Sequence, residues 1–385
     1  MTGPIGVAIV GCGYIADSYR LCLPMHAQDL RLCGVFDRDA ARLAAYVACW
    51  GDRGYASLGE LLADPAVSIV INATDPKNHV PVTRAALEAG KHVYSEKPLA
   101  MTRDMAKDLR DLAAAKGLRL SAAPCNILSE SAQTLWKALR AGAIGAPRLV
   151  YAELDDGMIH KADYRNWLSR SGKPWPARGE FDTGCTFEHA GYVLTILCAM
   201  FGPVRRVAAF STLVIPDKQT DIPLPHPAPD FSVGLLEFDG GITARITNSV
   251  VAPYDHRLRV IGDEGSLEIR DTWDYACPVK LRSVSQGRLA RYLERRFGGV
   301  GAAKPLPLVR TPAMKRKRGD PSMDFARGVA ELADAIRTSR AARLDADFAV
   351  HIAEVTEMLQ HPERFPRPAP VQSSFAPIKP ADWAA

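Results

Sequence analysis

The chain has 385 residues, of which 47% are hydrophobic and 24% charged, and its formal net charge is +5. At about 100–200 residues per domain this length favours two domains, and the composition is ordinary for a soluble globular enzyme or binding protein. No run approaches the roughly 18 apolar residues that cross a bilayer, and the N-terminal apolar run lacks the basic flank of a signal peptide. We therefore expect no membrane partner.

The first third of the chain alternates strand-like and helix-like patterns. Strands are expected at residues 5–10, 30–37, 67–74, 91–95 and 118–123, and helices at 14–27, 37–50 and 81–90. Strands that alternate with helices in units of about 30 residues indicate a parallel, doubly wound sheet. Residues 1–125 are therefore predicted to form an α/β Rossmann domain.

The pattern changes after about residue 125. Helices are expected near 129–142, 184–201, 322–339 and 346–360, and strands at 148–154, 204–215, 230–240, 241–251 and 256–271. Turn residues around 239–241 and 263–265 favour hairpins between neighbouring strands. Residues 126–385 are therefore predicted to form an α+β domain with a large, mainly antiparallel sheet.

A basic segment, about residues 280–318, contains a single acidic residue, Glu294. Such a charge run is either a solvated surface segment or an anion-seeking arm or lid, for example over a phosphorylated or nucleotide-linked substrate. A nucleic-acid partner is not expected, because no recognition motif accompanies the charge.

The eight cysteines are scattered, with no CxxC pair and no Cys/His quartet at zinc spacing. Most lie in apolar or helical contexts, where a reduced thiol packs as a small hydrophobic group. We expect a reducing, cytoplasmic compartment and no metal.

The stretch GCGYIA, residues 11–16, follows a buried strand and opens a helix, which is the context of a dinucleotide-binding turn. Gly11 allows the tight turn, Gly13 lets the backbone approach a pyrophosphate, and Tyr14 and Ile15 lie within the motif. Asp37 ends the second strand, where a carboxylate accepts hydrogen bonds from the adenosine ribose. Asp37 favours NAD, whereas Arg38 leaves NADP open because an arginine pairs with a 2′-phosphate.

Two further motifs carry a resemblance to a known family. ATDPKNH at 73–79 and SEKPLAMT at 95–102, with its EKP tripeptide opening a helix after the fifth strand, resemble the glucose–fructose oxidoreductase/inositol dehydrogenase (Gfo/Idh/MocA) family. The resemblance covers most of the chain and implies an open-faced second sheet and a homodimer or homotetramer. It implies that Lys97 reaches the reacting oxygen and that Glu96 positions lysine and cofactor. It also assigns to the cofactor loop Thr74, Pro76, Asn78 and His79.

The helix that begins near residue 184 allows two alignments to that family's Asp/His acid–base pair. One puts Cys185 and His189 at the paired positions; the other uses Gly202 as the helix end and puts Glu188 and Tyr192 there. We prefer the second, because it preserves a carboxylate. Tyr192 then exchanges a proton with the substrate, its pKa lowered by the ammonium of Lys97, while His189 flanks the pocket. Tyr192 as a core aromatic and His189 as a satisfied helix histidine remain the structural alternatives.

The connection at residues 163–182 is rich in Arg, Trp and Gly/Pro turns. Aromatic faces stack on sugar C–H surfaces, so Arg165, Trp167 and Trp175 are substrate candidates, unless this segment is only a connector.

Three functions remain open at this point. The first is an NAD(P)-dependent oxidoreductase that moves hydride at a secondary alcohol or ketone carbon of a sugar, amino sugar, cyclitol or related polyol, possibly a nucleotide-linked sugar. The second is a related glycosidase or epimerase that retains NAD through turnover. The third is a non-catalytic regulator that binds a nucleotide and a sugar.

Overall fold

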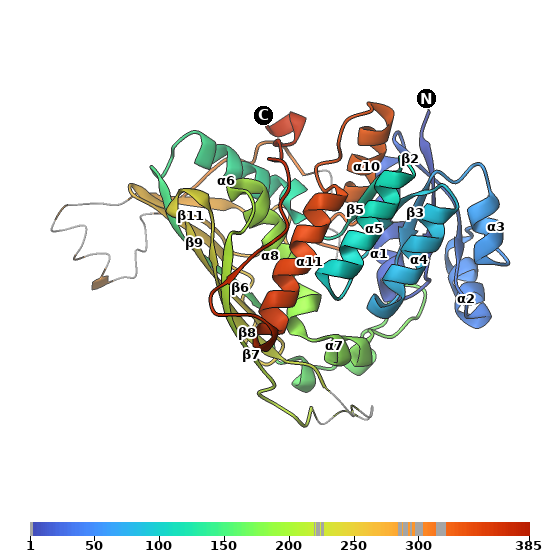
Figure 1. Ribbon diagram of the computed structural model, residues 1–385, viewed down its shortest axis with the longest axis horizontal. Coiled ribbons are helices and arrows are strands. Elements are labelled where there is room, and N and C mark those ends of the chain that lie inside the picture. The colour runs from blue at the N-terminus through green and yellow to red at the C-terminus, as the bar shows by residue number, and fades with distance from the viewer. Residues whose placement is uncertain are drawn as a thin grey trace.

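The computed structural model describes residues 3–218, 220, 224, 227–283, 287, 292, 295–296, 303–312 and 321–385. Two β-sheets lie side by side, with helices between and around them (Figure 1). Much of the basic segment, including the cluster at 315–318, falls outside the described residues.

The first sheet is parallel, as predicted, with strand order β2-β1-β3-β4-β5. Buried residues of α1, α2 and α10 pack on one face, and those of α3, α4, α5 and α11 on the other. Covered faces suit the uninterrupted apolar run of the first strand, which is buried along its whole length. The elements are β1 (Ile5–Val10), α1 (Tyr14–Cys22), β2 (Leu30–Phe36), α2 (Ala40–Trp50), α3 (Leu58–Ala63), β3 (Ile69–Asn72), α4 (Pro76–Glu88), β4 (His92–Ser95), α5 (Arg103–Ala115) and β5 (Leu120–Ala122).

The second sheet has nine strands among the described residues, in the order β13-β12-β11-β10-β6-β9-β8-β7-β14. Only its β6–β9 pair is parallel, so the mainly antiparallel prediction is confirmed. The inner face packs on α6, α8 and α11. The elements are α6 (Glu130–Arg140), β6 (Pro147–Asp155), α7 (Ala177–Thr183), α8 (Cys185–Phe201), β7 (Arg206–Thr212), β8 (Phe231–Glu237), β9 (Thr243–Ser249), β10 (Leu258–Gly262), β11 (Gly265–Ile269), β12 (Val279–Ser283), β13 (Ala303–Pro305), α10 (Arg327–Arg337), α11 (Ala346–Gln360) and β14 (Ala369–Pro370).

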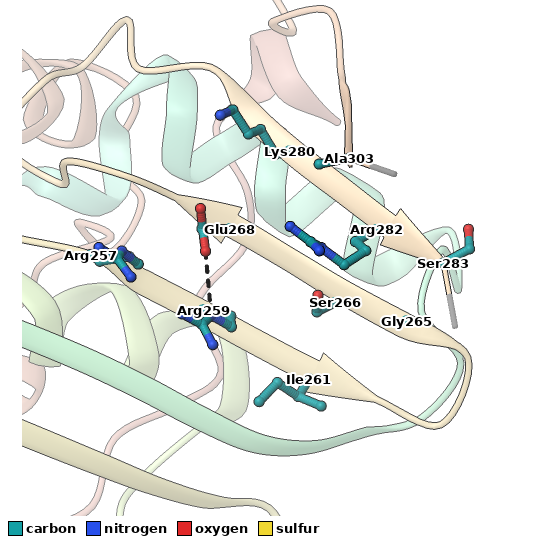
Figure 2. Close-up of a pocket in the computed structure, with 10 residues that line it drawn as sticks. All are labelled: Arg257, Arg259, Ile261, Gly265, Ser266, Glu268, Lys280, Arg282, Ser283 and Ala303. Carbon is teal, nitrogen blue, oxygen red and sulfur yellow. Dashed lines mark ion pairs between the residues drawn. The ribbon is translucent and has the colours of Figure 1, made fainter. Parts of the chain in front are cut away.

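No described helix covers the other face of this sheet. Figure 2 shows its basic end, where alternate residues of three strands line a groove of about 560 Å³. Arg257, Arg259, Lys280 and Arg282 supply the cations, and the one carboxylate, Glu268, lies 3.3 Å from Arg259. This groove contains the described start of the basic segment.

The chain returns to the first domain after the second sheet. Helix α10 packs into the core of the parallel sheet with Tyr19 and Tyr46, although the predicted division assigns it to the second domain. Gly328 makes this approach possible, because a Cβ there would lie 2.1 Å from the Tyr94 hydroxyl of β4. Helix α11 then runs between α5 and the large sheet (Figure 1).

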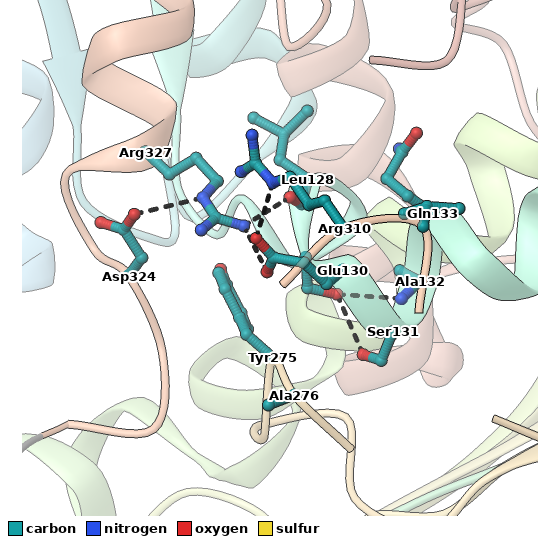
Figure 3. Close-up of polar contacts among 12 residues, drawn as sticks. Leu128, Glu130, Ser131, Ala132, Gln133, Tyr275, Ala276, Arg310, Asp324 and Arg327 are labelled. Atoms are coloured by element: carbon teal, nitrogen blue, oxygen red, sulfur yellow. Dashed lines mark hydrogen bonds and ion pairs between the residues drawn. The ribbon is translucent and has the colours of Figure 1, made fainter. Parts of the chain in front are cut away.

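A buried ionic network anchors this return (Figure 3). The carboxylate of Glu130, fully buried at the start of α6, accepts hydrogen bonds from Arg327 Nη1 at 2.8 Å and Arg310 Nε at 2.9 Å. Arg327 Nε also donates to Asp324 at 3.1 Å, and Asp324 lies 2.8 Å from His26 of the first domain. The network therefore ties the second domain to the first.

We expect Glu130→Gln to destabilise the fold by about 3–5 kcal/mol, because removing one partner of a buried ion pair leaves an uncompensated charge. Urea unfolding with an unchanged slope and a lower midpoint is the expected result. Asp263→Asn, which removes an exposed ion pair with Arg148, is the control and should leave the midpoint unchanged. Equal midpoints for both variants would contradict the role of the network.

Candidate active site

The strand order reverses between β1 and β3, and in open α/β sheets ligands bind at the carboxyl ends of strands at such a point. A cavity of about 650 Å³ lies there, lined by Gly13, Lys97 and Tyr192 among others, and therefore by both domains. A second cavity of about 180 Å³ adjoins it and includes Asp37.

The turn after β1 fits a dinucleotide phosphate. Gly11 has φ +97°, and a Cβ there would lie 2.7 Å from the Ala73 carbonyl oxygen. Gly13 caps α1 without a side-chain hydrogen bond and faces open space, so the N–H groups of the first helical turn are available to an anion. Tyr14 and Ile15 line the larger cavity.

Asp37 has a structural role that the sequence did not reveal. Its two oxygens accept backbone hydrogen bonds from Cys12 N and Asp39 N, both at 2.8 Å, which ties the end of β2 to the glycine turn. Each carboxylate oxygen has a second lone pair, so contact with a ribose hydroxyl is still possible. Asp37 and Arg38 both line the smaller cavity, and the choice between NAD and NADP stays a prediction.

The loop after β3 is placed as the resemblance implies, with one correction. Thr74 lines both cavities, Pro76 lines the larger one and Asn78 lines the smaller one. His79 also lines the larger cavity, but both of its ring nitrogens lie beside carbonyl oxygens, at 2.6 Å from Pro98 O and 2.8 Å from Thr74 O. It therefore holds two loops together and has no ring nitrogen left for a cofactor.

The EKP tripeptide lies at the larger cavity, but not at the start of a helix. It follows the fourth strand, β4, and α5 begins only at Arg103, capped by the Thr102 side chain. Glu96 is buried and accepts hydrogen bonds from the Tyr19 hydroxyl at 2.7 Å and from Lys97 N at 3.0 Å. Glu96 is therefore a fixed support for the Lys97 backbone.

Lys97 meets the second domain at Glu188. Its Nζ donates a hydrogen bond to the Glu188 carboxylate and lies 5.8 Å from the ring centre of Tyr192, one helical turn further along α8. Burial lowers the pKa of Lys97, but the negative charge of Glu188, together with the smaller contributions of Tyr192, Glu96 and Glu180, outweighs burial, and the net pKa lies above its usual value. Lys97 is thus a permanent cation, and Glu188 positions the lysine, whereas we expected it to act on the tyrosine.

The expected fall in the pKa of Tyr192 beside Lys97 is wrong. Burial raises the pKa of this phenol above its usual value, and the charge of Lys97 offsets the rise only in part. Tyr192 is therefore a proton donor at neutral pH. The indole of Trp273, whose ring centre is 4.8 Å away, packs against it.

His189 also reaches the larger cavity, but as a neutral group. Burial lowers its pKa to about 4. Its Nε2 lies 3.5 Å from Asp156 and 3.5 Å from Glu180, and its Nδ1 has no hydrogen-bond partner among the described residues. Cys185 lies outside the lining and packs among apolar side chains of α7 and its surroundings.

Residues that sequence reasoning missed in this lining include Asp156, Glu180 and Trp273, and also Lys173. Burial and the nearby Glu188 raise the pKa of Glu180 well above its usual value, and its Oε1 has no hydrogen-bond partner among the described residues. Asp156 directly follows a strand, a position that could have been noted. Nothing local marks Glu180 or Trp273.

Two of the three substrate candidates line the larger cavity and the third does not. Trp167 and Trp175 line the larger cavity, and their ring centres lie 5.4 Å apart. Arg165 does not line it, because its 3₁₀ turn buries the ring of Tyr164 and directs the arginine outward, where it stacks on that ring at 5.0 Å.

Among the described residues, no group of three or more His, Cys, Asp or Glu side chains is arranged to hold a metal ion. Within the same part of the chain, no single helix has the length and apolar character to cross a membrane. The pair α7 and α8 meets those criteria only when taken together, across an 82° bend.

Comparison with known proteins gives matches for both domains. The model described as "Oxidoreductase family, NAD-binding Rossmann fold" matches residues 5–123, and the "GFO/IDH/MocA C-terminal domain" matches residues 132–268. Trans-1,2-dihydrobenzene-1,2-diol dehydrogenase of Mus musculus is 24% identical over 269 residues, covering 69% of this chain and 74% of its own. Inositol 2-dehydrogenase 1 of Saccharopolyspora erythraea is 35% identical over 187 residues, covering 43% and 55%.

Solved structures share the fold. Aldose-aldose oxidoreductase from Caulobacter crescentus, complexed with glycerol, superposes with a TM-score of 0.70 at 23% identity, covering 94% of this chain and 98% of that chain. The dinucleotide turn, the EKP lysine at the domain boundary and the two domain matches lead to one conclusion. The chain is an enzyme of the Gfo/Idh/MocA oxidoreductase family, built on an NAD(P)-binding Rossmann domain.

Proposed function

We propose that this enzyme is a dehydrogenase or reductase of a neutral, polyhydroxylated substrate: a sugar, amino sugar, cyclitol or related polyol. The observation that carries the proposal is the meeting of Lys97 and Tyr192, from different domains, in one cavity. Nicotinamide supplies or accepts the hydride when bound. The chain's own groups must then handle charge and proton at the substrate oxygen.

Lys97 and Tyr192 divide that task. The ammonium of Lys97 stabilises negative charge that develops on the substrate oxygen during reduction. The phenol of Tyr192, held protonated by burial, donates its proton to that oxygen during reduction, and its phenolate form accepts the substrate's hydroxyl proton in the oxidative direction. Glu188 and the Glu96 backbone contact hold Lys97 in place, which contributes positioning.

The rest of the wall favours a neutral substrate. Asp156 and Glu180 line it, and Trp167, Trp175 and Trp273 offer apolar faces. Lys97, the cation of this end, is already paired with Glu188. Among the described residues, the unpaired lysine of this cavity, Lys173, lies beside the dinucleotide turn and not at this end. A substrate anion at Lys97 and Tyr192 would therefore face carboxyl groups and a lysine already engaged by one, whereas the hydroxyls of a polyol find both donors and acceptors.

Matched substrate pairs test this proposal. We expect kcat/KM for a neutral polyol or aldose to exceed that for the corresponding sugar acid or sugar phosphate by at least roughly tenfold, because like charges repel in a partly dry site. The measurement is a panel of such pairs with NAD and NADP, followed by the absorbance of the reduced nicotinamide. Asp156→Asn should bring the kcat/KM values for the neutral and the anionic substrate closer together. Asp182→Asn, which changes an exposed carboxylate on α7, should leave their ratio unchanged. A preference for the anionic partner would contradict the proposal.

A retained-cofactor glycosidase or epimerase remains the second candidate, because the larger cavity is lined by both domains and a segment of the second domain lies beside the dinucleotide turn. Turnover of substrate without net change in nicotinamide absorbance would identify it. The homodimer or homotetramer, the cytoplasmic location and the lack of a nucleic-acid or membrane partner stay predictions. The helix-free sheet face is the surface that an oligomer would cover.

A further inference from the structure

A hairpin of the second domain crosses to the first domain beside the dinucleotide turn. This segment, residues 167–175, is called the strap here. Its backbone closes on itself, with Leu168 opposite Pro174, Ser169 N donating to Lys173 O at 2.7 Å and Trp175 N donating to Trp167 O at 2.9 Å. The strap is therefore a built element with its own hydrogen bonds.

The tip of the strap is fastened to α1 by a buried carboxylate. Asp17, in the first turn of α1, accepts hydrogen bonds on Oδ2 from both the backbone N and the Oγ of Ser171, each at 2.8 Å. Its Oδ1 accepts a third from Trp50 Nε1 at 2.6 Å. The guanidinium of Arg170 lies 4.7 Å from the Trp50 ring centre. We call the Asp17–Ser171 contact the latch.

The strap brings a cation to the dinucleotide turn. Lys173 lines the larger cavity together with Gly13 and Tyr14. No ion pair of Lys173 occurs among the described residues. An unpaired ammonium thus faces the same space as the free N–H groups of α1.

Two independent features of the strap consequently point toward the coenzyme. The first is an unpaired cation beside an anion-binding helix N-terminus. The second is a partly buried hydrogen-bonded contact, made by the buried carboxylate of Asp17, that fastens the segment carrying this cation across the boundary between the domains. Neither is needed for the proton and charge chemistry at Lys97 and Tyr192.

We propose that Lys173 binds the pyrophosphate of the dinucleotide from the second domain, and that the latch holds the strap closed over the bound coenzyme. The strap then has to open before the coenzyme leaves, so release is slow. This proposal goes beyond the oxidoreductase activity and does not depend on the substrate.

Lys173→Met tests the phosphate contact. Loss of one charge-assisted hydrogen bond should raise the dissociation constants of NADH and NADPH by about 10- to 100-fold. Binding is measured without substrate, by the fluorescence of the reduced coenzyme titrated with the full-length protein. Adenosine, which has no phosphate, serves as the second probe and should bind the variant and the parent equally. Lys161→Ala removes an exposed charge from the same connection and is the matched control.

The latch is tested by release rates. Ser171→Ala removes one of the two hydrogen bonds from the strap and should raise the rate of NADH release several-fold. Asp17→Asn removes the negative charge and one of the two acceptor oxygens, so the three hydrogen bonds cannot all form and those that remain are weaker. This variant should raise the release rate further. Release is followed by stopped-flow displacement of NADH with excess NAD⁺. Ser171→Ala, a mild change, keeps the test decisive if Asp17→Asn does not fold.

Each outcome has a defined meaning. Equal weakening of NADH and NADPH, with unchanged adenosine binding and faster release from the latch variants, supports the proposal. Weakening confined to NADPH places Lys173 at the 2′-phosphate and overturns the pyrophosphate contact. The proposal is also overturned if Lys173→Met leaves the affinity for NADH unchanged, or if it weakens adenosine binding as much as NADH binding. It is overturned as well if Ser171→Ala releases NADH at the rate of the parent. If the parent turns over none of the substrates in the panel but the variants still show these binding effects, only the proposed substrate class is contradicted.

Discussion

Tyr192→Phe is expected to lower kcat by about 10²- to 10⁴-fold, the usual contribution of a positioned acid or base. The ring and its packing against Trp273 remain, so the coenzyme affinity and the unfolding midpoint should stay close to those of the parent. The measurement is steady-state kinetics on whichever substrate the panel identifies. Tyr151→Phe, on the helix-free sheet face where the ring stacks on Arg245, is the matched control.

The pH dependence separates Tyr192 from His189. Because the pKa of Tyr192 lies above its usual value near 10, reduction should be nearly constant between about pH 6 and 9, whereas oxidation should rise about tenfold per pH unit. His189, with a pKa of about 4, changes charge only in acid and cannot cause either slope. Full activity in Tyr192→Phe together with loss of activity in His189→Ala would show that our alignment of α8 is wrong.

Lys97→Met should lower kcat by about 10²- to 10³-fold, because it removes the cation that faces charge developing on the substrate oxygen. It also leaves the Glu188 carboxylate without its partner in a mostly buried position, so stability should fall as well. Activity and stability are measured in parallel, by turnover and by urea unfolding. Lys116→Met, an exposed lysine that follows α5, is the control.

Repeating Lys97→Met in a Glu188→Gln variant separates the effect of Lys97 on activity from its effect on stability. In Glu188→Gln no buried carboxylate loses its partner, so adding Lys97→Met should cost less stability than it does in the parent. The activity loss should persist, because the cation at the substrate oxygen is still missing. Recovery of activity in the double variant would show that Lys97 serves only to neutralise Glu188.

Much of the fold followed from local patterns. The strands at residues 5–10 and 30–36 and the helix at 346–360 were predicted close to their observed bounds, because each has a periodic or uninterrupted apolar pattern. The glycine turn at Gly11 and Gly13 was predicted for the same kind of reason: a short motif in a strand–turn–helix context demands special backbone geometry.

The contacts of the candidate site were less predictable. The expectation for Tyr192 considered its neighbour Lys97 but not burial, and burial proved the larger influence on its pKa. His79 was assigned to the cofactor from its motif, although its ring nitrogens contact Thr74 O and Pro98 O. Arg165 shares a short segment with Trp167, yet only the tryptophan lines the cavity. Orientation and desolvation depend on neighbours distant in sequence, which a motif does not contain.

The sequence by itself determined the kinds of element, the dinucleotide turn and the presence of a lysine suited to oxygen chemistry, since these depend on residues that are close together in the chain. Tertiary structure decided that Lys97 pairs with Glu188, 91 residues away, and that Ser171 fastens to Asp17, 154 residues away. It also decided that α10 returns to the first domain. Such contacts arise where two separately patterned surfaces meet, and the free energy of their packing is a property of the assembled pair.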